Sequence, residues 1–237
     1  MRVLIIISVF VAILFVSCTE KSEMLIVPDY SNYFPIAQGQ VQFFEVREIN
    51  IDAPLEIYDT TLYNLKIVAD TVYSSGDTLL GFYSILKSPS GAEQWVPVGR
   101  VVREIQSPVG NYIETQNNCR KIKARLPMRN SAHWNPNIYC ISSDSTDMSE
   151  IKALDVPRMF AGQGFDSVVH IVNQYDSSLI HLDVKQEYYA ANFGLVYLEE
   201  TKIVSNSSDL DFTKPIRERI VVGQMVEIRQ LLTSPIR

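Results

Sequence analysis

The hydrophobic pattern of this chain is typical of short β-strands. Segments rich in Val, Ile, Tyr and Phe alternate with turn-forming residues, and long apolar runs at helical spacing are scarce. The pattern predicts strands near residues 41–51, 62–73, 78–87, 94–105, 119–126, 137–141, 166–175, 180–190, 194–204 and 218–231. Clusters of Ser, Pro, Gly and Asp at residues 74–77, 88–91, 107–110 and 176–178 predict tight turns between them.

Short connections favour an antiparallel arrangement, because parallel strands need crossovers of about a dozen residues or more. Within residues 119–126, Lys121 and Lys123 alternate with Ile122 and Ala124, so we expect one solvated strand face that also carries Arg120 and Arg125. The predicted fold is mainly β, with little helix outside the signal peptide. It is an antiparallel meander that forms a curved sheet, a half-barrel or a barrel-like domain, and a sandwich remains open as well.

The first residues predict an export signal. Arg2 precedes a largely apolar stretch, residues 3–16, whose fourteen residues fall short of the roughly 20 that a transmembrane helix needs and match the signal-peptide range of about 7 to 15. The following Phe15-Val16-Ser17-Cys18 resembles a lipobox, with Phe15 at the usual position of Leu. This resemblance implies that Cys18 is acylated and begins the mature protein. The alternative is a plain signal peptide with an incidental cysteine.

The chain then divides into three parts: a lipoprotein signal peptide (1–17), a lipidated tether (18–32) and a single β-rich domain (33–237). No internal repeat, low-complexity segment or linker divides the last part. The 237 residues carry 21 basic and 27 acidic side chains, a net charge of −6. This acidic balance argues against nucleic acid as a partner. The expected membrane contact is the lipid on Cys18, which places the protein at the outer membrane, on its periplasmic face or the cell surface.

Two further cysteines, Cys119 and Cys140, can form a disulfide in an oxidising compartment. Closing a loop of roughly 20 residues would contribute about 3 kcal/mol. Zinc is the other possibility, because His133 lies between the two cysteines, but a fourth ligand is missing. We therefore expect no metal site and no cofactor.

Several short motifs, spread over most of the chain after Cys18, resemble a group of Bacteroidetes outer-membrane or surface lipoproteins of unknown function. They are Tyr33-Phe34-Pro35-Ile36 with Gly39, Ile67-Val68-Ala69-Asp70-Thr71 before Gly76, Trp95, Ala124-Arg125-Leu126-Pro127 before Trp134, and Glu187-Tyr188-Tyr189-Ala190 running into Phe193-Gly194-Leu195-Val196-Tyr197. The resemblance implies an envelope location and carries no activity.

The last of these motifs predicts a hairpin in which Gly194 takes up backbone strain. Asn192 stands where similar chains have glycine, and Asn tolerates positive φ better than other non-glycine residues. Packing accounts for the aromatic residues here. The alternative is a binding face made from Tyr188, Tyr189, Tyr197, Trp95 and Trp134. Since neighbouring strand residues point to opposite sides, Tyr188 and Tyr189 cannot join the same surface.

No catalytic residues can be nominated. The histidines are His133, His170 and His181, and no Gly-x-Ser-x-Gly motif is present. With a turn at 176–178, His170 would lie opposite about position 184. The leading hypothesis is a non-enzymatic binding or interaction module for an unknown protein, glycan or apolar ligand. The alternatives are an envelope enzyme with a dispersed carboxylate and aromatic site, and a purely structural lipoprotein.

Overall fold

The structure, a computed structural model, describes residues 27–140, 148–205 and 213–231, which form one antiparallel sheet of twelve strands. The strands are β1 (Val41–Asp52), β2 (Ile57–Ser75), β3 (Thr78–Pro89), β4 (Val96–Gln106), β5 (Gly110–Gln116), β6 (Cys119–Leu126), β7 (His133–Trp134), β8 (Ser149–Phe160), β9 (Gln163–Ser177), β10 (His181–Ala190), β11 (Gly194–Ser205) and β12 (Ile220–Leu231). Three 3-10 turns accompany them: η1 (Ser31–Tyr33), η2 (Ala53–Leu55) and η3 (Ile216–Glu218).

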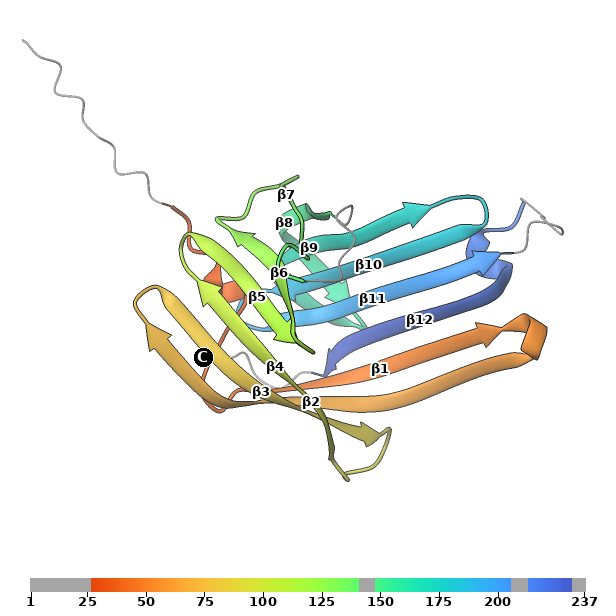
Figure 1. Cartoon of the computed structure of the whole chain (residues 1–237), viewed down its shortest axis with the longest axis horizontal. Coiled ribbons are helices and arrows are strands. Elements are labelled where there is room, and N and C mark those ends of the chain that lie inside the picture. The colour runs from red at the N-terminus through yellow and green to blue at the C-terminus, as the bar shows by residue number, and fades with distance from the viewer. Residues whose placement is uncertain (1–26, 141–147, 206–212, 232–237) are drawn as a thin grey trace, which may run out of the picture.

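The order of strands in the sheet is β6-β5-β4-β3-β2-β1-β12-β11-β10-β9-β8-β7. The chain moves outward from β1 to one edge at β6, continues at the other edge with β7, and returns strand by strand to pair β12 with β1. The sheet curls so far that it forms a nearly closed barrel (Figure 1). The predicted mainly β, antiparallel meander with barrel-like curvature is thereby confirmed.

The two edge strands are joined through the segment that follows β7. The backbone N–H of Ile122 in β6 donates to the carbonyl of Pro136 at 2.8 Å, and the indole Nε1 of Trp134 donates to the carbonyl of Ile122 at 2.9 Å. A disulfide between Cys119 and Cys140 lies at the same place. Both edges are therefore covered, which leaves fewer unpaired backbone groups open to other chains.

The prediction of a strand at 137–141 is wrong for the part that the structure describes. Residues 136–139 form a turn, in which the N–H of Asn137 donates to the side-chain oxygen of Asn135 at 2.8 Å. The N–H of Cys140 in turn donates to the carbonyl of Asn137 at 2.8 Å. The chain bends here because Cys140 reaches back to Cys119.

The segment before β1 packs into the end of the barrel. Tyr33, Phe34 and Ile36 are buried in the main hydrophobic core. The ring of Phe34 stacks on Tyr112 with centroids 4.3 Å apart and meets Tyr189 edge-on at 5.0 Å. Burying one such aromatic side chain contributes roughly 1.5–3 kcal/mol. The Tyr33-Phe34-Pro35-Ile36 motif is therefore a structural part of the core.

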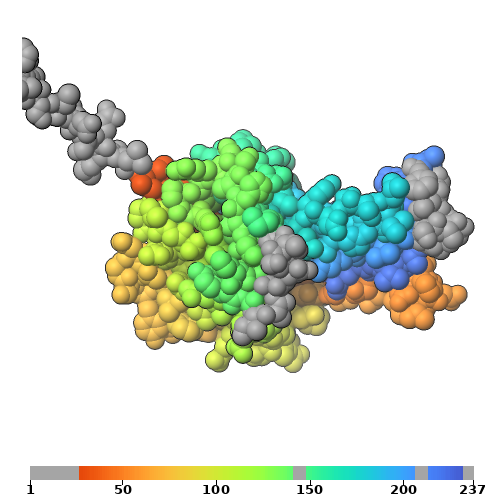
Figure 2. All heavy atoms as spheres, turned by 45° about the horizontal axis from the view of Figure 1, so that its top comes forward, coloured from red at the N-terminus to blue at the C-terminus, as the bar shows by residue number. Residues whose placement is uncertain are grey.

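At the opposite end, β10, β11 and β12 extend with β1 and β2 past the body formed by β3 to β6 (Figure 2). A separate small core covers this extension, with Leu182, Val184 and Ile203 packed against Ile216 and Ile220. Among the described residues, no helix has the length and apolar character needed to cross a membrane.

The hairpin between β10 and β11 has the backbone expected from its residue types. Gly194 has a φ of +80° and Asn192 a φ of 68°. A Cβ atom added to Gly194 would lie 3.0 Å from the side-chain nitrogen of Gln42. Only glycine fits this backbone without moving Gln42, which is buried and hydrogen-bonded to Arg103.

Candidate functional site

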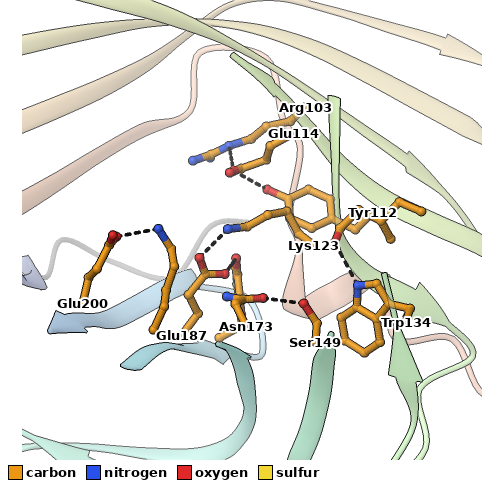
Figure 3. A network of polar contacts seen from close by, with 12 residues as sticks. Arg103, Tyr112, Glu114, Lys123, Trp134, Ser149, Asn173, Glu187 and Glu200 are labelled. Carbon is orange, nitrogen blue, oxygen red and sulfur yellow. Dashed lines mark hydrogen bonds and ion pairs between the residues drawn. The ribbon is translucent and has the colours of Figure 1, made fainter. Parts of the chain in front are cut away.

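Polar side chains from several strands meet inside the barrel (Figure 3). Arg103 in β4 is only 6% exposed, and its Nε donates to Glu114 of β5 at 3.0 Å. Its other end donates to the side-chain oxygen of Gln42 at 2.8 Å. The hydroxyl of Tyr112 donates to the same carboxylate oxygen of Glu114 at 3.0 Å. A buried charge of this kind is tolerated because its partners satisfy it.

A second ion pair crosses the interior between Lys123 of β6 and Glu187 of β10. Glu187 is fully buried, and the hydroxyl of Tyr189 donates to its second oxygen at 2.7 Å. Burial opposes the ionisation of Glu187, but the attraction and hydrogen bond of Lys123 outweigh it, so the pKa of Glu187 is lowered. Burial likewise opposes the charge of Lys123, and Glu187 outweighs it and raises the pKa of Lys123.

A third ion pair lies nearby and joins β10 to β11. Lys185 of β10 donates to Glu200 of β11 at 2.6 Å, and the other oxygen of Glu200 lies 3.2 Å from the exposed Lys202. The attraction of Lys185 overcomes the effect of burial, so the pKa of Glu200 is lowered. Both carboxylates on this side of the interior are thus held ionised in ion pairs.

Of these residues, Glu114, Lys123 and Lys185 border a cavity of about 370 Å³ between β5 and β6 on one side and β9 and β10 on the other. Three lysines line it, and we name it the lysine pocket after them. Its lining consists of Lys121, Lys123, Lys185, Glu114, Gln116, Asn117, Asn137, Asn173, Gln174, Cys119 and Pro136. All of these except Cys119 and Pro136 are polar or charged. The volume falls at the lower end of the 300–1,000 Å³ that is usual for small-molecule sites.

Lys121 differs from the other two lysines of the pocket. It makes no ion pair or hydrogen bond with any residue in the described part of the chain. Partial burial at the cavity, together with repulsion from Lys185 and Lys123, lowers the pKa of Lys121. The pocket therefore contains one cation whose charge is not balanced by a contacting carboxylate.

Asn173 supplies the second unsatisfied group of the pocket. Ser149 donates its hydroxyl to the side-chain oxygen of Asn173 at 2.9 Å. The amide nitrogen of Asn173 is buried and has no hydrogen-bond partner within the described ranges. Buried donors without an acceptor are rare in folded proteins, because each one costs free energy. Because this nitrogen is buried, it is not itself exposed to the cavity that Asn173 lines.

The sequence prediction for this strand needs correction. Lys121, Lys123 and Arg125 share one face as alternation predicted, and Lys121 and Arg125 are exposed. Lys123 is the exception: it is largely buried because the curled sheet brings Glu187 of β10 against this face. The remaining apolar partners, Ile122 and Ala124, are buried as alternation predicted.

The structure distributes the five aromatic residues of the proposed binding face over three surroundings. Tyr188 and Tyr197 meet with centroids 5.8 Å apart, beside Phe160 and His170. Tyr189 and Trp134 are buried in the main core. Trp95 lies elsewhere, 5.9 Å from the ring of Phe43. As expected from strand geometry, Tyr188 and Tyr189 do not share a surface.

The expected position of His170 opposite residue 184 is wrong. His170 pairs with Tyr188, and the two rings stack with centroids 4.2 Å apart. The strand β9 continues to Ser177, so the turn lies further along the chain than residues 176–178, and a register shift follows between Lys185 and Gln186. The later turn alone would place residue 189 opposite His170, and the register shift moves the partner back by one residue to Tyr188.

Cys119 and Cys140 are joined as a disulfide, and Cys119 lines the lysine pocket. Among the described residues, no group of three or more His, Cys, Asp or Glu side chains is placed to hold a metal ion. Cys18, for which lipidation is predicted, lies outside the described residues.

No protein-family model and no curated protein matches the chain. Among solved structures, the chain is similar to a "putative exported protein" with a YMCC-like fold from Bacteroides fragilis, at 10% identity and a TM-score of 0.44. It is also similar to a "putative lipoprotein" from Parabacteroides distasonis, at 12% identity and a TM-score of 0.37. Each alignment covers 84% of this chain and 98% of the other.

Both neighbours are Bacteroidetes proteins. At these identities and TM-scores the likeness carries no argument about what this chain does. The location and function proposed below therefore rest on its own residues.

Proposed function

We propose that this protein is a ligand-binding module of the cell envelope, held on the outer membrane by lipid on Cys18, and that the lysine pocket is its binding site. The observation that carries the proposal is a partly open cavity with a mostly polar lining, on which three lysines converge, and of these Lys121 has no contacting carboxylate among the described residues. A concave site with a few convergent polar groups is the usual form of a small-molecule site.

The polar lining favours a polar ligand over the apolar one considered from the sequence. An apolar ligand would cover the charge of Lys121 without giving it a partner, which costs free energy. A polar ligand can satisfy the same group. The proposed ligand is therefore small and hydrophilic.

Binding is favoured over catalysis because the carboxylates of the interior already have partners. Glu187 and Glu200 are ionised and paired with lysines, so neither is available as a proton acceptor without breaking its pair. Among the described residues that line the cavity, none is a histidine.

An envelope enzyme is the second candidate, and one observation favours it. The pKa of Lys121 is lowered, first by burial and then by its two lysine neighbours, and a neutral lysine amine can act as a nucleophile. The two candidates differ in what happens to a compound bound in the pocket. Under the binding proposal it is released unchanged, whereas chemical conversion that requires Lys121 would favour the enzyme.

The experiment that tests the proposal is a ligand screen by NMR on the purified full-length protein in detergent, with neutral, acidic, basic and apolar small molecules. The expected result is saturable binding that disappears in Gln116→Trp, which fills the cavity from the exposed end of β5. The matched control is Tyr188→Ala, in the aromatic cluster with Phe160 and Tyr197 outside the cavity lining, which should leave binding intact. Binding that survives Gln116→Trp and is lost in Tyr188→Ala would contradict the proposal.

A further inference from the structure

We infer that the end of the barrel at which the chain enters rests on the lipid bilayer, with an exposed apolar patch in contact with the membrane surface. The inference rests on the lipid anchor at Cys18 that the proposed function includes. Three observations carry it: where the tether joins the fold, how far the tether can reach, and which side chains are exposed at that end.

The tether joins the fold beside two turns. The hydroxyl of Ser107, between β4 and β5, donates to the carboxylate of Asp29 at 2.6 Å. The backbone N–H of Ser107 donates to the carbonyl of Asp77, in the turn between β2 and β3, at 3.0 Å. The start of the described chain is therefore fixed to the end of the barrel at which these two turns lie (Figure 1).

The reach of the tether keeps this end close to the membrane. An extended chain covers at most about 3.6 Å per residue, so residues 19–29 span no more than about 40 Å. A short linker also turns contact between the fold and the bilayer into an intramolecular event with a high effective concentration. Apolar side chains that would bind a membrane only weakly on their own can therefore hold this end against it.

The outer surface at this end carries an apolar patch, which we define as Tyr73, Leu80, Phe82 and Val109. Tyr73 is 60% exposed, and its ring meets that of Phe82 edge-on with centroids 6.0 Å apart. Phe82 points outward, because its strand neighbour Tyr83 is buried in the main core. Leu80 lies opposite Tyr73 in the pairing of β2 with β3, and Val109 is exposed in the turn between β4 and β5.

The chemistry of the patch fits a lipid surface. Aromatic side chains, and tyrosine in particular, favour the membrane interface, because the ring is apolar and the hydroxyl reaches water. No residue of the patch is charged, and the turns at residues 74–77 and 107–110 contain Asp77 but no lysine or arginine. Contact with the bilayer therefore depends on burial of apolar area and requires no anionic lipid.

The test measures contact with lipid by fluorescence quenching. Full-length lipidated protein is reconstituted into phosphatidylcholine vesicles whose acyl chains carry bromine, which quenches a tryptophan only on close approach. Tyr73→Trp places a probe in the patch. Tyr58→Trp is the matched control, because Tyr58 is 69% exposed and lies at the other end of the same strand, up to roughly 50 Å away. The unmodified protein gives the contribution of Trp95 and Trp134.

We expect brominated lipid to quench the added tryptophan of Tyr73→Trp, whereas that of Tyr58→Trp should keep its fluorescence. Adding Phe82→Asp to Tyr73→Trp should abolish the quenching, because a carboxylate in the patch opposes its burial in lipid. Leu55→Asp, at an exposed position near Tyr58, should leave the quenching unchanged. All variants should float with the vesicles in a density gradient, since they keep the anchor at Cys18.

Equal quenching of the two added tryptophans, or quenching of neither in protein that floats with the vesicles, would overturn the inference and leave the anchor in place. Protein that does not float would overturn the anchor and the inference together. A blue shift of the Tyr73→Trp emission that grows with protein concentration in detergent, without quenching in vesicles, would show that a second copy covers the patch instead. The ligand screen decides the lysine pocket separately, because no residue of the patch lines it.

Discussion

Gly194 connects the tight hairpin between β10 and β11 to the polar network inside the barrel. Its positive φ is unfavourable for a side chain, and an added Cβ would press on the amide nitrogen of Gln42, which donates to the carbonyl of Phe193 at 3.0 Å. Gln42 in turn accepts a hydrogen bond from Arg103. A substitution at Gly194 would therefore disturb the hydrogen bond between Gln42 and the buried Arg103.

We expect Gly194→Val to destabilise the protein by roughly 1–3 kcal/mol through backbone strain. In a domain of this size about 1 kcal/mol lowers the melting temperature by roughly 2–4 °C, so a decrease of several degrees should be seen by circular dichroism. Gly164→Val in β9 is the control, because Gly164 has no positive φ and an added Cβ would have open space. Equal melting temperatures for the two variants would contradict the role assigned to Gly194.

Glu187 holds the only fully buried carboxylate among the buried residues that the structure describes, and its removal should be costly. Glu187→Gln leaves Lys123 charged without its partner, and breaking a buried pair in this way destabilises by about 3–5 kcal/mol. Glu200→Gln breaks a partly exposed pair and should cost about 1 kcal/mol or less. Urea unfolding of both variants checks the difference, and similar losses would show that the Lys123 pair is not buried.

The same carboxylate predicts an acid limit to stability. The pKa of Glu187 is lowered from its usual 4.5, because the attraction of Lys123 outweighs the effect of burial. A group with a lowered pKa contributes stability at pH values above 4.5, and that contribution is lost as the pH falls through the lower pKa of the folded state. We expect the melting temperature to decrease below pH 4.5 more steeply in the unmodified protein than in Glu187→Gln. Identical pH profiles would contradict this.

The residue types predicted those features whose cause is local in the sequence, but not those that depend on residues distant in the sequence. Asn192 and Gly194 indicated positive φ because the preference is a property of the single residue. The pair Lys123 and Glu187 could not be predicted, because the two residues are 64 positions apart and meet only when the sheet curls. Alternation placed Lys123 on the polar face of its strand, but it cannot show that the curled sheet brings Glu187 against that face.

At the scale of strands, the sequence located most elements but missed β5, β8 and the two-residue β7. The strand β5 is short and mostly polar, so its composition resembles a loop. In β8 the pairing with β9 is irregular at three places, and Asp155 has a φ of 59°. Such bulges break the period of two on which strand prediction depends. The wrong prediction at 137–141 reflects a disulfide that bends the chain.

The disulfide also predicts a measurable property. Native full-length protein should have no alkylatable thiol at Cys119 or Cys140 after denaturation, and two after reduction. Because the bond closes a span of 21 residues, reduction should cost about 3 kcal/mol and lower the melting temperature. Cys119→Ser with Cys140→Ser is the matched variant and should melt like the reduced protein. Free thiols at both positions in unreduced protein would rule the bond out.

For the whole molecule, the sequence predicted an antiparallel meander without choosing between barrel and sandwich. The choice depends on the pairing of β1 with β12 and on the contact between β6 and the segment after β7. These contacts join parts of the chain that are distant in sequence, and no short pattern encodes them. Sheet curvature also decides whether polar residues face solvent or a cavity, so the lysine pocket could not be predicted.

The lipid anchor is tested by Cys18→Ser in cells supplied with a labelled fatty acid. We expect the variant to lose the label and to remain as uncleaved precursor at the inner membrane, because acylation of Cys18 precedes cleavage of the signal. Cys119→Ser should keep its label, since that cysteine is disulfide-bonded within the fold. Labelling that persists in Cys18→Ser would refute the anchor.

The arrangement of charges in the interior is tested most directly by the rate at which its lysines are acetylated, measured by mass spectrometry on the native protein. Only the neutral amine reacts. Lys121 is exposed and its pKa is lowered by partial burial and by neighbouring lysines, whereas Lys123 is largely buried and kept charged by Glu187. We predict that Lys121 reacts faster than Lys123, because Lys121 is exposed with a lowered pKa whereas Lys123 is largely buried with a raised pKa. Equal rates for the two lysines would contradict the account of an interior in which Glu187 keeps Lys123 buried and charged.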